Sequence, residues 1–208
     1  MGNNKGKLIN TFQGMRVQTG HGELDEKYLI KIDETIKLAL NAYPRTSAMR
    51  VDLRYPEGYT VVENNHISKF IASFKAIIRA DLNKKKRGKS TPRFIWVKEQ
   101  DSSNHPHYHI VVFLNGNVYS HLGYFTAKEG NTAARIRQAW ASALGVHIID
   151  IDGAVHYPDH ATYTLNKTDS NYKAQYDDLF YRLSYFAKKH SKEFSNHTFN
   201  CFGMSRSV

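Results

Sequence analysis

The sequence contains a single cysteine, Cys201, among 208 residues. One thiol excludes an internal disulfide and a zinc site built from several cysteines. Long apolar stretches are also missing: the longest uninterrupted aliphatic and aromatic run is residues 110–114, far below the roughly 18 residues that a membrane helix needs. The opening Met-Gly-Asn-Asn-Lys lacks the apolar segment of a signal peptide. We therefore expect a cytoplasmic protein with no membrane partner.

Acidic residues are scarce relative to basic ones. The chain has 19 Asp and Glu against 29 Lys and Arg, for a formal charge of +10 and a pI of about 9.6. Such a balance favours a polyanionic partner, with nucleic acid first and an anionic membrane surface second. With 41% hydrophobic residues, the chain can still bury a substantial core.

Residues 1–22 are rich in glycine and asparagine, which predicts a loose arm, and the length of the remaining chain predicts one domain over residues 23–208. Periodicities of three to four residues indicate helices, and alternation indicates strands. Asn65 can cap the second helix, and Gly145 ends the third. The predicted helices are 23–42, 66–83, 132–144 and 178–189, and the predicted strands are 49–55, 93–99, 107–114, 146–151 and 198–204.

This order of elements predicts an α+β protein. A helix is followed by β-α-β-β-α-β and then by α-β, which indicates a split β-α-β antiparallel sheet with helices on one face and an extra N-terminal helix. The polar segment 100–106 between two strands indicates a hairpin.

The most informative stretch is His-Pro-His-Tyr-His at residues 105–109. Because side chains alternate along a strand, His107 and His109 point to one face and Tyr108 to the other. Two imidazoles at this spacing can hold one divalent metal. The alternative is a pair of exposed or hydrogen-bonded histidines with no ligand role.

A third ligand is expected from the neighbouring strand. Glu99 ends that strand, and folding the hairpin back brings it opposite His107. Gln100 is a nearby substitute, and Asp150 with Asp152 is the second choice. A nitrogen and oxygen site with open positions suits Mg²⁺ or Mn²⁺ acting as a Lewis acid on a phosphoryl oxygen.

A tyrosine-bearing helix complements the histidines. At about 100° per residue, Tyr181, Tyr185 and Lys188 fall within about 60° of one another on one helix face. This set suits phosphodiester transesterification, with a phenolate as nucleophile and a lysine that holds the phosphate. The plainer alternative is tyrosines packed on the sheet and an exposed lysine. The opposite face carries an apolar stripe that needs its own cover, for which the N-terminal helix is a candidate: Leu179, Leu183 and Phe186.

These motifs resemble those of a known superfamily. His107-Tyr108-His109 resembles the His–hydrophobic–His signature of HUH endonucleases, and Tyr185-Phe-Ala-Lys188 resembles their Tyr-x-x-Lys motif. Residues 94–100, 107–112 and 182–188 resemble the replication-initiator family of filamentous phages and related prophage proteins with a YagK/YfjJ-like domain. The resemblance covers most of the chain, roughly residues 45–205. Tyr108 departs from it, because the middle position is usually more aliphatic.

The resemblance implies a ferredoxin-like sheet and a metal-dependent nickase that initiates rolling-circle replication of a phage or related mobile element in a bacterial cell. It implies His107 and His109 as metal ligands, Glu99 as the third, and Tyr185 as the nucleophile that leaves a 5′-phosphotyrosyl enzyme and a free 3′-OH. Some members use two tyrosines four residues apart, which would include Tyr181. Two rivals remain: a noncatalytic DNA- or RNA-binding regulator, and a metal phosphodiesterase that uses water.

The expected substrate is single-stranded or origin DNA. The chain lacks the Gly-x-x-x-x-Gly-Lys-Ser loop of a nucleotide-driven helicase, so a separate helicase is expected as a partner. Aromatic residues of one loop could stack unpaired bases or pack as a lid: Tyr119, Tyr124 and Phe125. The candidate DNA contacts are a basic run and two arginines of the first strand: Lys84, Lys85, Lys86, Arg87, Arg50 and Arg54.

Overall fold

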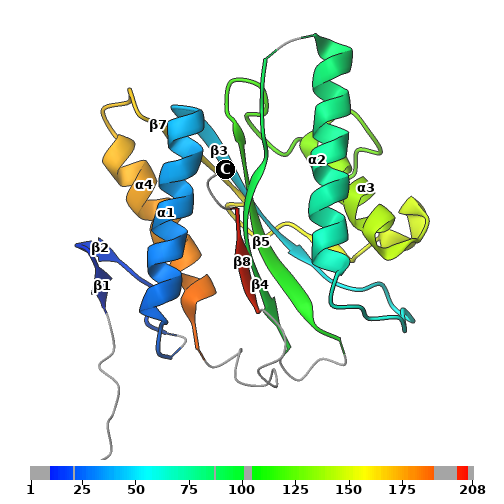
Figure 1. Ribbon diagram of the computed structural model, residues 1–208, viewed down its shortest axis with the longest axis horizontal. Helices are drawn as coiled ribbons and strands as arrows, with labels where there is room; N and C mark the ends of the chain where they lie inside the picture. The colour runs from blue at the N-terminus through cyan, green and yellow to red at the C-terminus, as the bar shows by residue number, and fades with distance from the viewer. Residues whose placement is uncertain (1–9, 21, 87, 101–104, 190–200, 206–208) are drawn as a thin grey trace, which may run out of the picture.

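A computed structural model describes residues 10–20, 22–86, 88–100, 105–189 and 201–205. The described chain forms a twisted antiparallel sheet with helices packed on both sides (Figure 1). The strands occur in the order β6-β3-β5-β4-β8, and β7 also pairs with β3. The principal strands are β3 (Arg45–Leu53), β4 (Arg93–Glu99), β5 (His107–Asn115), β6 (Val155–His156), β7 (Thr162–Asn166) and β8 (Phe202–Met204).

The α+β prediction is confirmed, including its split β-α-β arrangement. β3 and β4 both pair antiparallel with β5, which lies between them. The helix α2 (His66–Lys85) connects these two outer strands. The helix α3 (Thr132–Leu144) follows β5 and packs beside α2. The crossover through α2 therefore makes β3 and β4 parallel to each other, with β5 antiparallel between them.

The prediction that helices cover one face is wrong, because both faces of the central strands are apolar. On β5, Val111 and Val112 point to opposite faces and both are fully buried. One face packs against α2 and α3. The other packs against α1 (Glu26–Ala42) and α4 (Tyr172–Ser184), as Figure 1 shows. The apolar stripe of α4 is covered in part by α1, as expected, and comprises Leu179, Leu183 and, in the following turn, Phe186.

Several element boundaries differ from the predicted ones. The predicted strand 146–151 is instead a short 3-10 helix, η1 (Ile148–Ile151), because His147 and Asp150 form a reciprocal capping box. The helix predicted over 178–189 begins at Tyr172, since Tyr176 extends the buried stripe by donating a hydrogen bond of 2.6 Å to Asp33 Oδ1. It ends early because Lys188 forms an extended bridge with Leu24. The last strand is shorter than predicted, and residues 198–200 lie outside the described residues.

The expected loose arm is also corrected over residues 10–20. Two short strands, β1 (Thr11–Phe12) and β2 (Met15–Arg16), form a hairpin whose apolar side chains are buried. The Phe12 ring stacks on Phe180 of α4 at 5.7 Å. The backbone N–H of Gln18 donates to Ser184 Oγ at 2.9 Å. This segment therefore belongs to the domain. None of the described helices is long and apolar enough to cross a membrane.

Candidate metal and tyrosine site

Three side chains meet at one end of the β4–β5 hairpin. Glu99 lies opposite His107 in the register of these strands, and His109 follows two residues later on the same face. One ligand atom from each of Glu99, His107 and His109 lies within 4.8 Å of the others. This group could hold a metal ion, and its third member is the predicted Glu99. Asp150 instead caps η1, and the exposed Asp152 pairs with Arg137.

Asp52 orients one of the two histidines. It lies opposite His109 in the pairing of β3 with β5, and its Oδ1 is 2.6 Å from His109 Nδ1. The pKa of Asp52 is lowered: burial raises it, but hydrogen bonds from His109 and His156 and the charges of His109 and Arg50 together outweigh burial. An ionised carboxylate can only accept, so His109 Nδ1 carries the hydrogen. His109 Nε2 then faces Glu99 Oε2 at 3.3 Å. A histidine that donates its other ring N–H to a carboxylate, as His109 does to Asp52, is typical of metal centres.

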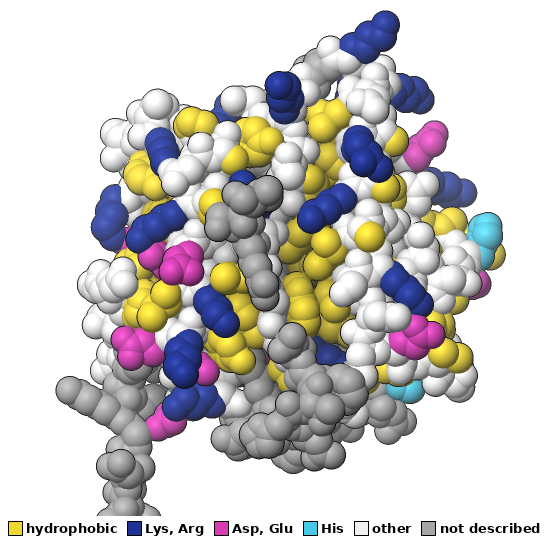
Figure 2. Space-filling view, viewed as in Figure 1, with side chains coloured by type: hydrophobic (Ala, Val, Ile, Leu, Met, Phe, Trp, Pro, Cys, Tyr) yellow, Lys and Arg dark blue, Asp and Glu magenta, His cyan; other side chains and the backbone are white. Residues whose placement is uncertain are grey.

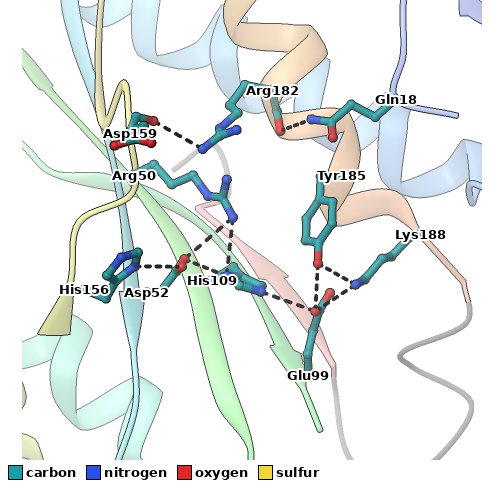
Figure 3. A network of polar contacts seen from close by, with 10 residues as sticks. All are labelled: Gln18, Arg50, Asp52, Glu99, His109, His156, Asp159, Arg182, Tyr185 and Lys188. Atoms are coloured by element: carbon teal, nitrogen blue, oxygen red, sulfur yellow. Dashed lines mark hydrogen bonds and ion pairs between the residues drawn. The ribbon is translucent and has the colours of Figure 1, made fainter. Parts of the chain in front are cut away.

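Sequence reasoning missed Asp52 as a site residue. The alternation of strand 49–55 already placed its side chain on the same face as Arg50 and Arg54, which was the available signal. His156 was also missed, and its Nδ1 lies 3.5 Å from Asp52 Oδ2 (Figure 3). Only strand pairing reveals these contacts, because Asp52 and His156 face each other between β3 and β6.

Tyr185 and Lys188 join the histidine cluster from the other side, as Figure 3 shows. Both follow α4, in and just after the 3-10 turn η2 (Tyr185–Ala187). Lys188 Nζ donates to the Tyr185 hydroxyl at 2.6 Å and lies 3.0 Å from Glu99 Oε2. The Tyr185 hydroxyl in turn lies 3.4 Å from the same carboxylate oxygen. The predicted nucleophile and the predicted metal ligands therefore share one polar network.

Charge and burial oppose each other at this tyrosine. Burial raises the pKa of Tyr185, and the hydrogen bond from Lys188 lowers it by less. Burial lowers the pKa of Lys188, but its contacts with Tyr185 and Glu99 raise it overall. Burial likewise lowers the pKa of His109, and the carboxylates of Asp52 and Glu99 reverse that effect. The resting network thus pairs a neutral phenol with a cationic lysine and an ionised glutamate.

The second tyrosine does not join this cluster. Tyr181 is 41% exposed, and the Arg16 guanidinium lies over its ring at 5.5 Å. No polar contact connects it with Glu99, His107 or His109 in the described part of the chain. The predicted common helix face fails because the α-helix ends at Ser184, so Tyr185 belongs to a tighter turn with a different angular step.

The predicted DNA contacts separate into two groups. Arg50 is buried beside the site, with its guanidinium 5.6 Å from the Tyr185 ring centroid and its Nε without a hydrogen-bond partner among the described residues. Arg54 is exposed just beyond β3. The basic run instead lies where α2 ends and the chain leads to the start of β4, whereas Glu99 ends that strand (Figure 1). The length of β4 separates this run from Glu99 by roughly 20 Å. The exposed members of the run are Lys84, Lys85 and Lys86, and Arg87 lies outside the described residues.

Comparison with known proteins identifies the family. The YagK/YfjJ C-terminal domain model matches residues 8–205. The chain is 34% identical over 215 residues to "Uncharacterized protein YagK" of Escherichia coli (strain K12), covering 95% of this chain and 99% of that protein. It is 31% identical over 195 residues to "Uncharacterized protein YfjJ" of the same strain, covering 86% and 93%. No solved structure matches. The chain therefore belongs to the YagK/YfjJ C-terminal domain family.

Proposed function

We propose that this protein is a metal-dependent, single-strand DNA nickase and strand transferase of the HUH type, which initiates rolling-circle replication of a phage or related mobile element. One observation carries the proposal: the Tyr185 hydroxyl lies 3.4 Å from Glu99, within the group that could hold a metal. A nucleophile beside an electrophilic centre is the arrangement that covalent phosphoryl transfer needs. Neither rival function requires a tyrosine at that place.

In the proposed reaction, the Tyr185 oxygen attacks the scissile phosphorus of a single strand. The new bond joins this oxygen to phosphorus, the bond from phosphorus to the 3′-oxygen breaks, and the products are a 5′-phosphotyrosyl protein and a free 3′-OH. The phenol loses its proton to solvent, and the 3′-oxygen gains one. Lys188, at 2.6 Å from the hydroxyl oxygen, favours the phenolate and is placed to contact the phosphate.

Glu99, His107 and His109 would hold Mg²⁺ or Mn²⁺, which when bound supplies Lewis acidity at a non-bridging phosphoryl oxygen. The donor set fits, because it mixes imidazole and carboxylate and Asp52 already fixes one imidazole in a ligand-competent tautomer. Arg50 is a further cation beside Tyr185, and its positive charge would attract the phosphate of the bound strand.

The proposed partner is single-stranded or origin DNA. Lys and Arg side chains are spread over α1 and α2 on the face in Figure 2 and continue to the top of the view, where α2 ends. This distribution supports backbone contacts that depend on salt. A separate helicase would expose the origin strand.

The test uses purified protein, Mn²⁺ or Mg²⁺, and labelled single-stranded DNA from the element that encodes the protein, resolved on a denaturing gel. We expect a labelled protein band that disappears in Tyr185→Phe and persists in Tyr181→Phe, the matched control. His107→Ala should bind DNA but not cut it. Cleavage without a covalent band would indicate the water-using phosphodiesterase, and tight binding without cleavage would indicate the noncatalytic regulator.

A further inference from the structure

A concave surface lies at the β6 edge of the sheet, beside the proposed active site. It encloses about 650 Å³ between the segment that precedes α3, the 3-10 helix η1 and β6. Its lining combines aromatic, aliphatic and basic side chains, including Phe125, Lys128, Arg137, Ile149 and His156. None of these residues belongs to the proposed metal or nucleophile set.

One wall of this cavity is an aromatic platform. The Phe125 ring stacks on Tyr157 with centroids 4.4 Å apart and planes 17° from parallel. Tyr157 is held in turn by its hydroxyl, which donates to the backbone oxygen of Ala133 at 3.0 Å. Phe125 nevertheless stays 49% exposed. An exposed aromatic ring backed by a fixed second ring offers a flat surface on which another ring can stack.

The segment that presents Phe125 is well defined by its contacts. Gly123 has a φ of +84°, and a Cβ there would meet the Asn131 side chain at 2.6 Å. The Asn131 amide donates to the Tyr124 backbone oxygen at 2.8 Å. Only glycine fits this approach, so the turn places Phe125 reproducibly. Of the other loop aromatics, Tyr119 is buried and donates to Asp81, whereas Tyr124 is 85% exposed and does not line the cavity.

The other groups in the cavity suit a negatively charged ligand with an apolar ring. Lys128 and His156 contribute a cation and an imidazole, and Ile149 is 69% exposed beside them. Arg137 pairs with Asp152, whose carboxylate is the acidic group in the lining. A nucleotide of a single strand combines a flat base with a phosphate and matches this mixture. The bases of a paired duplex stay stacked on one another and cannot enter.

One residue, His156, links the cavity to the proposed active site. His156 lines the cavity and also lies 3.5 Å from Asp52, which orients His109. Figure 3 shows His156, Asp52 and His109 in a row that leads to Glu99. A strand that crosses His156 can therefore have one nucleotide in the cavity and a nearby phosphate at the metal group.

We propose that this cavity binds an unpaired nucleobase of the DNA strand, one that flanks the cut position, stacked on Phe125. The inference rests on the proposed function for its substrate and adds where the strand is held beside the cut. It makes Phe125 a DNA-binding residue, separate from the chemistry.

The test measures binding without cleavage. Tyr185→Phe protein in EDTA is titrated into fluorescently labelled single-stranded oligonucleotides, and affinity is read by anisotropy. Phe125→Ala should weaken binding about 5- to 150-fold, the range for losing one stacked base. Tyr124→Ala removes the neighbouring, more exposed ring and should change affinity less than about twofold. Equal effects of the two variants, or no effect of either, would overturn the proposal.

A second pair of variants guards against misfolding. Ile149→Glu adds a negative charge at an exposed cavity position and should weaken binding without lowering thermal stability, while Val61→Glu, an exposed position between β3 and α2, should leave binding unchanged. Binding that is insensitive to both Phe125→Ala and Ile149→Glu would refute the cavity even if nicking succeeds. If Phe125→Ala and Ile149→Glu both weaken binding but the native protein forms no covalent band on the denaturing gel, the nickase is refuted and the cavity is retained.

Discussion

Replacing Asp52 by asparagine should weaken metal binding while leaving the sheet intact. Asp52 Oδ1 lies 2.6 Å from His109 Nδ1, and the pKa of the Asp52 carboxyl is lowered. The carboxylate is therefore ionised, and the contact is a charge-assisted hydrogen bond. In Asp52→Asn the amide oxygen can still accept from Nδ1, but the negative charge is lost. His109 then becomes a poorer electron donor at Nε2, the nitrogen that faces Glu99.

The magnitude follows from the two kinds of hydrogen bond. One to a charged group contributes about 1.5–3 kcal/mol, and a neutral one contributes about 0.5–1.5 kcal/mol. The difference of roughly 1–1.5 kcal/mol corresponds to about a tenfold loss of Mn²⁺ affinity in Asp52→Asn. Asp52→Ala removes the whole interaction and should lose about 10- to 100-fold.

Isothermal titration of Mn²⁺ into the folded proteins measures both losses. Asp152→Asn is the control, because it removes a carboxylate that the sequence also offered as a ligand but that lies outside the Glu99, His107 and His109 group. It should bind Mn²⁺ with unchanged affinity. If Asp52→Asn binds as tightly as the native protein, or if Asp152→Asn loses the metal, the orienting role of Asp52 is refuted.

Three further substitutions test the fold. In the native protein the buried Arg135 guanidinium lies 2.6 Å from the Asp81 carboxylate. Asp81→Asn removes this counter-charge and should lower the free energy of unfolding in urea by about 3 kcal/mol. Burial raises the pKa of Asp81, but Tyr119, Lys85 and Arg135 lower it overall. The stability of the native protein should therefore fall as the pH drops below 3.8, the ordinary pKa of this carboxyl, and the variant should show a shallower fall. Gly203→Ala would put a Cβ within 2.4 Å of the Trp96 ring, and we expect a loss of about 1–3 kcal/mol in the same assay. Phe186→Ala removes a fully buried ring beneath the site and should cost about 3–5 kcal/mol; a change below 1 kcal/mol in thermal or urea unfolding would contradict the packing.

Local pattern was sufficient for the histidine strand and its neighbour. β4 begins and ends at the predicted residues 93 and 99, and β5 begins at the predicted residue 107. Both strands carry dense apolar residues bounded by a polar segment, and a short connection makes an antiparallel hairpin the natural outcome. Strand alternation then placed His107 and His109 on one face, and the hairpin brought Glu99 opposite His107. The candidate metal ligands were therefore predictable from sequence.

Long-range pairing decided what local pattern could not. Alternation shows to which face Asp52 points but not which strand lies beside it, and only the β3–β5 register brings it to His109. The strand β6 has two residues, too short for a periodic signal, yet it brings His156 to the site.

The tyrosine pair shows the same division between sequence and structure. A regular helix would have aligned Tyr181 with Tyr185, but the bridge between Lys188 and Leu24 requires the chain to leave the α-helix first. By itself, the sequence determined the chemistry available at each strand and helix, because side-chain type and local periodicity are properties of neighbouring residues. Which of these groups meet was decided by the tertiary structure, since strand register and helix termination depend on contacts between residues far apart in the chain.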